Sequence, residues 1–395
     1  MKDRKEFYDF FGIVLTLGTG SILVVSLLYV TIPLMPLLGS EFHTSPGQTV
    51  WAGSAYGFAY AVGNLIIGIF SDRFHRKTIL GIGLVALALS TLAVGLSPTL
   101  AWLIVLRIIQ GLIAASFPTV ALAYIGDVLS SRYRPIAISI LSSSFLLSGI
   151  LGQLYAQAIG SWLGWSGVFE ILAISYLVIA YFIYRLPAGG LSHAELSLSH
   201  VIGRTIKLVT VPSLLVSFAV SATVLFSFVT MYSGLGTYVS ERFHLHEQGL
   251  MWIRIGGIPG IVMSLFAGPL LKRFEAKRVF IAGLATAGIG LGVEALSGSL
   301  IPLVIASIIF VTGISIANPS IIVLIGHLGG ESRGSALAIN AFSAFVGASL
   351  GQLLAEYSKS FAVLCLILIM ILFLSAITTW LCIPTLRSRS VLDNR

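Results

Sequence analysis

Twelve apolar runs, each long enough to cross a lipid bilayer, divide this chain of 395 residues. A membrane-spanning helix needs about 20 apolar residues. Runs of that order lie near 10–36, 48–70, 78–96, 99–126, 135–160, 165–185, 211–239, 249–270, 279–297, 301–324, 334–356 and 360–384. Because the joins between them are short, we expect neighbouring runs to be antiparallel neighbours in space. The pattern predicts an all-α membrane protein with twelve transmembrane helices.

The composition excludes the soluble classes of protein. Apolar residues make up 57% of the chain and charged residues only 10%, whereas a soluble domain carries about 25% charged residues. A net charge of +8 would raise nucleic acid as a partner of a soluble protein. Here the bases sit in short turns between apolar runs, so we expect a lipid bilayer and no nucleic acid. The first run exceeds the core of a signal peptide, about 7–15 residues, and is expected to be retained.

The distribution of lysine and arginine predicts the orientation in the membrane. With the N-terminus in the cytosol, the inner turns and tails hold 19 of the 23 bases, and the outer turns hold only Arg242 and Lys359. The remaining two, Arg107 and Arg254, fall within runs. Since cytoplasmic loops carry an excess of bases, we expect a multi-pass protein of the inner (plasma) membrane, with both termini in the cytoplasm.

The chain reads as two related halves. Residues 72–83 are DRFHRKTILGIG and residues 272–283, which lie 200 positions later, are KRFEAKRVFIAG. At the same offset, Ile-Gly-Asp at 125–127 corresponds to Ile-Gly-His at 325–327. Parallel repeats of this kind occur in transporters. We therefore predict two pseudo-symmetric six-helix bundles, 1–185 and 211–395, joined by a cytoplasmic linker at 186–210 that is rich in glycine and serine.

One loop carries a family resemblance. The stretch 63–77 reads GNLIIGIFSDRFHRK, and its Gly68, Asp72, Arg73, Arg76 and Lys77 fall at the spacing of a signature loop between the second and third membrane helices. In this respect the chain resembles the Major Facilitator Superfamily of transporters, although His75 stands where the family usually has glycine. The resemblance extends over the whole chain and implies the twelve-helix fold of that superfamily.

The resemblance also implies a role for this loop in conformational change. It predicts that Asp72, together with Arg134 and the start of the eleventh span, latches the two halves when the cytosolic side is closed. A helix N-terminus favours a nearby carboxylate by about 0.3–2 kcal/mol. The alternative interpretation is that the bases of the loop only anchor the topology of the chain.

A second stretch, LIVLRIIQGLIAAS at 103–116, places Arg107, Gln110 and Gly111 as in the twelve-span drug and metabolite efflux branch of the superfamily. An arginine inside a span costs at least about 2.5 kcal/mol on insertion scales, so we do not expect it to point at lipid. We expect Arg107 to face the interior between the halves and to tune the binding of substrate or protons. The alternative is an arginine that snorkels to the outer surface.

The fifth span carries small residues at every fourth position: Ser144, Ser148, Gly152, Ala156 and Gly160. Such a ridge allows two helices to approach closely. Antiporters of the superfamily carry a glycine-rich stretch here that ends in Gly-Pro. Gly149 and Gly152 match that stretch, but Gln153 stands where the proline belongs, and close packing alone is the alternative interpretation.

Other polar residues within the runs are predicted to line a central substrate cavity: Tyr56, Tyr60, Asn64, Gln153, Gln157, Thr230, Tyr232, Arg254 and Asn318. Glu170, Glu294 and Glu356 lie near the outer ends of spans, and the first span has no deep carboxylate, so the proton site is not assigned. We expect Cys365 and Cys382 to be buried apolar side chains. His244 and His246 have no clustered carboxylate or cysteine, so we expect no metal and no cofactor.

These observations predict a secondary active transporter that works by alternating access, with proton-coupled efflux of a drug or metabolite as its function. The first alternative is proton-coupled uptake of a small organic anion, with Arg107 and Arg254 as counter-charges. A membrane-embedded enzyme or sensor is a remote alternative, because the sequence shows no deep catalytic cluster and no appended domain. A phosphate-binding glycine loop followed by Lys-Ser/Thr is missing, so ATP is not expected to drive transport. We expect a monomer.

Overall fold

The computed structural model describes residues 2–70, 75–130, 133–187, 207–243, 252–253, 255–263, 267–330, 333–358 and 360–384. Every regular element among these residues is helical. The described helices leave many large apolar side chains on the surface, for example Leu89 at 65% and Phe373 at 64% exposure. Apolar surface of this extent requires a non-aqueous neighbour, which for a chain of long apolar helices is lipid.

The first half of the chain forms helices α1 to α8. Their bounds are α1 Lys2–Ser26, α2 Thr31–Phe42, α3 Pro46–Thr49, α4 Trp51–Phe70, α5 Arg76–Gly95, α6 Leu100–Ala114, α7 Ser116–Val128 and α8 Arg134–Arg185. The second half forms α10 Pro212–Phe243, α12 Ile258–Val262, α13 Ala267–Arg273, α14 Ala276–Leu296, α15 Leu300–Leu328, α16 Arg333–Tyr357 and α17 Phe361–Cys382.

Helix α8 contains two of the predicted spans. At Gly164 the backbone leaves the helical region (φ 76°), a conformation that glycine adopts without steric cost. The Tyr155 hydroxyl donates a hydrogen bond of 2.8 Å to the Val168 carbonyl. Thirteen residues of straight helix would separate these positions by about 20 Å. The chain therefore folds back at Gly164, between the predicted fifth and sixth spans.

Within the described ranges, ten helical segments are long and apolar enough to cross a membrane. They account for ten predicted spans, and the second arm of α8 accounts for one more. The predicted eighth span, 249–270, falls partly outside the described residues, and α12 and the start of α13 lie within it. The predicted linker falls largely outside the described residues as well.

Two predicted spans are interrupted. The first is broken between Ser26 and Thr31, and the fourth is broken at Ala115. Pro33 and Pro118 lack the N–H groups that would bond the carbonyls of Tyr29 and Ala114 in a continuous helix. Proline removes these bonds just where each helix stops.

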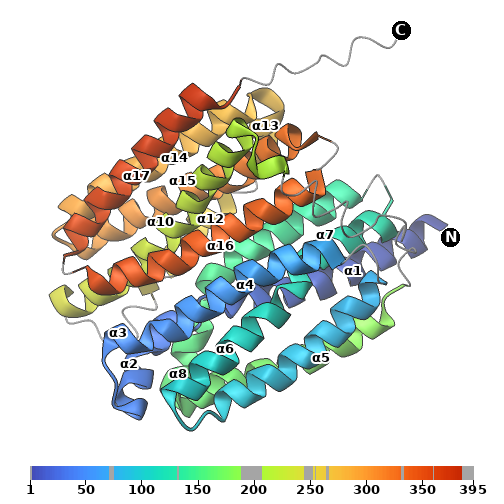
Figure 1. Ribbon diagram of the computed structural model, residues 1–395, viewed down its shortest axis with the longest axis horizontal. Helices are drawn as coiled ribbons and strands as arrows, with labels where there is room; N and C mark the ends of the chain where they lie inside the picture. The colour runs from blue at the N-terminus through green and yellow to red at the C-terminus, as the bar shows by residue number, and fades with distance from the viewer. Residues whose placement is uncertain are drawn as a thin grey trace.

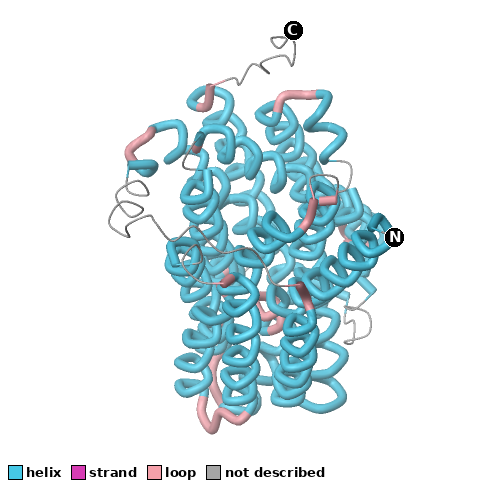
Figure 2. The backbone as a smooth tube through the Cα atoms, turned by 90° about the vertical axis from the view of Figure 1, so that its right-hand side faces the viewer, coloured by secondary structure: helices cyan, strands magenta, loops and turns pink. Residues whose placement is uncertain are grey.

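The helices gather in two groups that lie side by side, with α4 and α16 along the boundary between them (Figure 1). Within the first group α1 and α5 pack against α8, and α4 packs against α6. Within the second, α14 packs against α15 and α17, and α10 packs against α16. Figure 2 shows the long helices running alongside one another through the length of the molecule.

The alternation of the helices defines two ends of the molecule. The basic face holds the end of α4, the starts of α5, α8, α14 and α16, and the ends of α13 and α17. The opposite face holds the turns between α2 and α3, α5 and α6, α14 and α15, and α16 and α17. The functional contacts below fall at the basic face, within the first group, and at the boundary near the opposite face.

Candidate functional site

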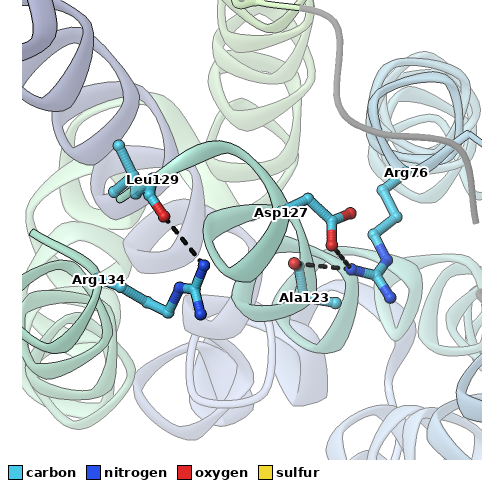
Figure 3. A network of polar contacts seen from close by, with 5 residues as sticks. All are labelled: Arg76, Ala123, Asp127, Leu129 and Arg134. Carbon is cyan, nitrogen blue, oxygen red and sulfur yellow. Dashed lines mark hydrogen bonds and ion pairs between the residues drawn. The ribbon is translucent and has the colours of Figure 1, made fainter. Parts of the chain in front are cut away.

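At the basic face, the signature loop is tied to the end of α7. Arg76 Nη1 lies 2.6 Å from Asp127 Oδ1 and donates a second hydrogen bond, 2.8 Å long, to the Ala123 carbonyl (Figure 3). Both charged side chains are partly exposed, at 17% and 28%. The carboxylate therefore fixes the start of α5 against α7.

Asp127 is a site residue that the sequence motifs did not predict. The signal that could have found it is the Ile-Gly-Asp triplet, whose counterpart in the second half is Ile-Gly-His and which indicated only that the two halves are related. Asp72 and Arg73 lie outside the described residues, so their predicted latch stays a prediction. Arg134, the expected partner of Asp72, is exposed and donates a hydrogen bond of 3.1 Å to the Leu129 carbonyl (Figure 3).

Lys77 extends this network to the end of α8. Its Nζ donates to the Leu186 carbonyl and lies 5.7 Å from the centre of the Tyr184 ring. The loop bases Arg76 and Lys77 thus bind the ends of α7 and α8. In this conformation both bases hold helices of the first group together.

Arg107, on α6, is completely buried and fully engaged. Its Nε donates to the Ala52 carbonyl (2.9 Å), one Nη to the Gln110 side chain (2.7 Å) and the other to the Leu27 carbonyl (2.7 Å). The guanidinium also lies 4.0 Å from the centre of the Tyr56 ring. A buried charge is tolerated only with such a set of partners.

The position of Arg107 corrects the expectation that it faces the space between the halves. All of its partners above belong to the first group of helices, so the guanidinium lies inside that group. The break after Ser26 explains why, because it leaves the Leu27 carbonyl outside a regular helix and free to accept from the arginine. Snorkelling is also excluded, since the side chain has no exposed surface.

Gln110 and Gly111 support the same cluster. The Gln110 amide donates to Thr91 Oγ1 on α5 at 2.7 Å, which fixes the carbonyl oxygen that Arg107 binds. A Cβ at Gly111 would collide with the backbone of Tyr56 and Tyr60 on α4. The sequence motif therefore describes one structural unit in which α4, α5 and α6 meet.

The two groups make close contact near the opposite face. The Gln352 amide on α16 donates to the Leu28 carbonyl (3.2 Å), and the Ser54 hydroxyl on α4 donates to the Ser349 carbonyl (3.2 Å). A Cβ at Gly57 would overlap the Ser349 hydroxyl. Backbones this close leave no room for water, so the opposite face is shut along α4 and α16.

Aromatic rings from both groups meet beneath this contact. Tyr60 of α4 packs edge-on against Phe345 of α16, with ring centres 4.4 Å apart. Tyr29, in the break between α1 and α2, packs edge-on against Phe228 of α10 at 6.1 Å. Phe228 in turn lies 4.9 Å from Tyr232. The middle of the boundary is therefore lined with rings.

Neutral hydrogen-bonding atoms accompany the rings. Three such atoms are buried and have no hydrogen-bond partner among the described residues: the Tyr56 hydroxyl, Gln153 Oε1 and Gln352 Oε1. Buried polar atoms are normally paired with protein or water, so three orphaned atoms near one boundary suit a site that binds a partly polar ligand.

The remaining predicted cavity residues differ in their contacts and burial. Asn64, Gln153 and Thr230 each bond a carbonyl one turn earlier in their own helix, and Thr230 also reaches the Gly351 carbonyl at 3.2 Å. Gln157 and Tyr232 are buried, whereas Asn318 is half-buried. Arg254 lies outside the described residues.

The small residues of the fifth span serve two contacts. A Cβ at Gly152 would collide with Ser26 of α1, and the Ser26 hydroxyl donates to the Ser148 carbonyl at 3.3 Å. The ridge through Gly152 therefore packs α8 against α1. Gly149 instead faces the rings of Phe228 and Tyr29, so it lies at the boundary between the groups.

A hollow of about 400 Å³ opens between α1 and the two arms of α8. Its lining is almost entirely aliphatic, including Leu23, Leu151, Leu154 and Leu172. It offers few polar groups for recognition, so we place the candidate site at the aromatic boundary instead. Within the described ranges, no three His, Cys, Asp or Glu side chains come together as a metal site.

The comparisons with known proteins agree with this arrangement. The family model of the Major Facilitator Superfamily matches residues 17–352. The chain belongs to this superfamily. It is therefore a multi-pass membrane transporter with two helical bundles, and not an enzyme.

Individual members of the superfamily resemble the chain at low identity. The MFS-type transporter YybF of Bacillus subtilis is 26% identical over 263 residues, which cover 66% of this chain and 65% of that protein. Two solved structures share the fold. A D-xylose-proton symporter aligns with a TM-score of 0.79 at 18% identity and covers 95% of this chain and 98% of its own. A bacterial homologue of the lysosomal transporter Spinster, in an inward-facing conformation, aligns at 0.72 and 15%, with 95% and 96% covered.

Proposed function

We propose that this superfamily member expels a small, uncharged aromatic compound, a drug or a metabolite, in exchange for protons. The observation that carries the proposal is the meeting of Tyr29, Tyr60, Phe228 and Phe345 from both helix groups. Aromatic rings pack well on planar apolar ligands, and orphaned neutral atoms nearby can bind one or two polar groups of such a ligand.

The chemistry of Arg107 argues against the anion alternative. An anion carrier needs a cation whose donors face the substrate. The guanidinium of Arg107 instead donates its hydrogen bonds to Leu27, Ala52 and Gln110. Arg254, the second counter-charge of that alternative, lies outside the described residues.

The contact along α4 and α16 supports alternating access. A carrier of this type opens its central site to one side of the membrane at a time. If the basic face lies in the cytosol, as the distribution of bases predicts, the shut opposite face makes this a conformation closed to the outside. The Spinster homologue that aligns with the chain is likewise described as inward-facing.

The test uses purified protein in liposomes and three labelled probes: chloramphenicol (neutral), tetraphenylphosphonium (cationic) and p-aminobenzoate (anionic). Counterflow without a gradient reports which charge class is carried. We expect exchange of chloramphenicol. Proton antiport predicts that the probe accumulates when the liposome interior is acidic, whereas proton symport predicts accumulation when the exterior is acidic. Exchange of the anion alone would overturn the proposal.

A matched pair of variants tests the site. Phe228→Leu removes a ring at the boundary, while Phe373→Leu removes one from the lipid-facing surface of α17, where it is 64% exposed. A ring contact is worth about 0.5–1.5 kcal/mol, so Phe228→Leu should weaken probe binding roughly threefold to tenfold. Phe373→Leu should leave binding unchanged. Equal effects of the two variants would contradict the placement of the site.

A further inference from the structure

Glu294 is a buried carboxyl that the transport site does not use. It lies in the last turn of α14, near the opposite face, with only 1% of its surface exposed. Among the described residues, neither of its carboxyl oxygens has a hydrogen-bond partner. This contrasts with Arg107, the buried charge of the other half, whose guanidinium binds three acceptors.

Among the described residues, no cation pairs with the carboxyl of Glu294. In α15 the one ionisable side chain is His327, at the basic-face end, and α13 carries Lys272 and Arg273 there as well. In α14 itself, Lys277 and Arg278 lie about 25 Å along the helix. In α17, Cys365 is buried within electrostatic reach of Glu294, and Cys382 lies at the far end. In the last turn of α10, Glu241 and Arg242 are exposed. Arg254 and Lys359 lie outside the described residues.

An ionised carboxylate in such surroundings would lose its hydration without gaining a counter-charge or a donor. The neutral acid is therefore the form that suits this conformation. A purely structural position would favour glutamine or leucine, because neither side chain ionises. A carboxyl that must be neutral here but can ionise in water suits a group that takes up and releases a proton.

Helix α10 connects this carboxyl to the boundary between the halves. Phe228 of α10 contacts Tyr29 across the boundary, and ten residues further on Tyr238 reaches the Glu294 turn. The Tyr238 hydroxyl donates to the Ser297 carbonyl (3.3 Å), and its ring stacks on Phe361 at the start of α17 (4.8 Å). A movement of α10 that opens the opposite face would disturb the packing around Glu294.

We propose that Glu294 is the proton-binding site of the transporter. The carboxyl is protonated while the opposite face is shut. When that face is open and wet, the group can exist as a carboxylate and takes up a proton from that side, so that only the neutral acid is buried when the face shuts. This inference rests on the proposed proton coupling and names the residue that carries it. Because protonation stabilises the shut conformation, acid should favour closure of the opposite face and alkali should favour its opening.

The test measures closure directly and needs no substrate. Ser54→Cys places a thiol in the contact between α4 and α16, and a membrane-impermeant maleimide applied at the opposite face labels it only when that face opens. Labelling of the protein with its native cysteines alone is subtracted. Because maleimides react with the thiolate, whose fraction itself rises with pH, the labelling rate is expressed relative to that of the exposed thiol in Gly298→Cys at the same pH. We expect the labelling rate to rise with pH, by up to about tenfold per pH unit for one linked proton.

Three variants in the Ser54→Cys background decide the assignment. Glu294→Gln mimics the protonated acid, so labelling should be slow at every pH. Glu294→Asp keeps a carboxyl and should keep a pH-dependent rate. Glu241→Gln removes an exposed carboxylate from the last turn of α10 and should behave as the parent. A flat parent profile, or a pH slope retained in Glu294→Gln, would overturn the proposal.

Infrared spectroscopy provides a second measurement that does not depend on the added cysteine. The parent protein in lipid should show the carbonyl band of a protonated carboxyl that shifts in heavy water, and Glu294→Gln should lose it. A band that persists in Glu294→Gln would assign the proton elsewhere and overturn the inference. Neither readout uses the transport probes, so a failed counterflow panel would reject the proposed substrate class and leave the assignment of Glu294 to these two measurements.

Discussion

At the scale of residues, Arg107 is a buried charge whose contacts are with the protein itself. Its guanidinium satisfies the Leu27 and Ala52 carbonyls. The next residues along the chain, Leu28 and Gly53, face Gln352 of the other half. Arg107 therefore positions the two backbone segments on which closure of the opposite face depends.

Replacing Arg107 by alanine should reduce both stability and transport. Each buried acceptor left unpaired costs about 1–3 kcal/mol, so thermal stability in detergent should fall and counterflow should drop roughly tenfold or more. Arg107→Lys should rescue only part of both, because an ammonium lacks the planar fork that reaches three divergent acceptors. Arg242→Ala, at the exposed end of α10, is the control. Full transport and unchanged stability in Arg107→Ala would contradict this role.

The two acids considered for the latch, Asp72 and Asp127, should differ in their effects. Asp127→Asn breaks a partly exposed ion pair with Arg76 within the first group, worth about 0–1 kcal/mol. It should lower stability slightly and leave the balance between inward and outward conformations unchanged. Asp72→Asn, if Asp72 forms the predicted latch, should shift that balance roughly fivefold to thirtyfold, which corresponds to about 1–2 kcal/mol. Cysteine labelling at both faces measures the balance. A larger shift in Asp127→Asn than in Asp72→Asn would assign the latch to Asp127 instead.

The site residues were only partly predictable from the sequence. The family resemblance grouped Arg107, Gln110 and Gly111, and the structure joins them in one cluster. The direction of the Arg107 side chain could not be foreseen, because it depends on the carbonyls freed by the break after Ser26. Asp127 was missed because its partner, Arg76, is 51 residues away in sequence.

At the scale of helices, the spans were predictable and their interruptions were not. Length and hydropathy determine where a membrane helix exists, and ten segments confirm this directly. The breaks before Thr31 and at Ala115 depend on prolines, but proline alone does not determine a break. Pro319 lies inside α15, which remains one helix from Leu300 to Leu328.

The glycines of α4 should control closure of the opposite face. A valine at Gly57 would overlap the Ser349 hydroxyl and approach Leu28, so at least one of these side chains must shift. Overpacking of this kind costs about 1–3 kcal/mol. Gly57→Val should therefore hold the face open and increase the labelling of Ser54→Cys roughly fivefold to a hundredfold, while counterflow is lost. Gly81→Val is the matched control, because nothing lies within 4 Å of a Cβ at Gly81. An unchanged labelling rate in Gly57→Val would show that α4 and α16 do not form the gate.

At the scale of the whole molecule, the repeated halves and the basic turns define one direction across the membrane. The offset of 200 residues pairs the start of α5 with the start of α14, so both lie at the same face. The structure places Arg76, Lys77, Lys277 and Arg278 there. If this basic face lies in the cytosol, as the distribution of bases predicts, the shut contact along α4 and α16 faces the outside of the cell.

The orientation can be measured with two single cysteines near the two ends of α14. Arg278 lies in its first turn with a side chain that is 80% exposed. Gly298 lies two residues beyond its last turn, and nothing is within 4 Å of a Cβ there. In intact cells, a membrane-impermeant maleimide should label Gly298→Cys, and it should label Arg278→Cys only after the membrane has been opened. Both native cysteines are first replaced by serine, because Cys382 is exposed at the same end of the molecule as Arg278. Labelling of Arg278→Cys in intact cells would reverse the orientation, and with it the side to which the present conformation is closed.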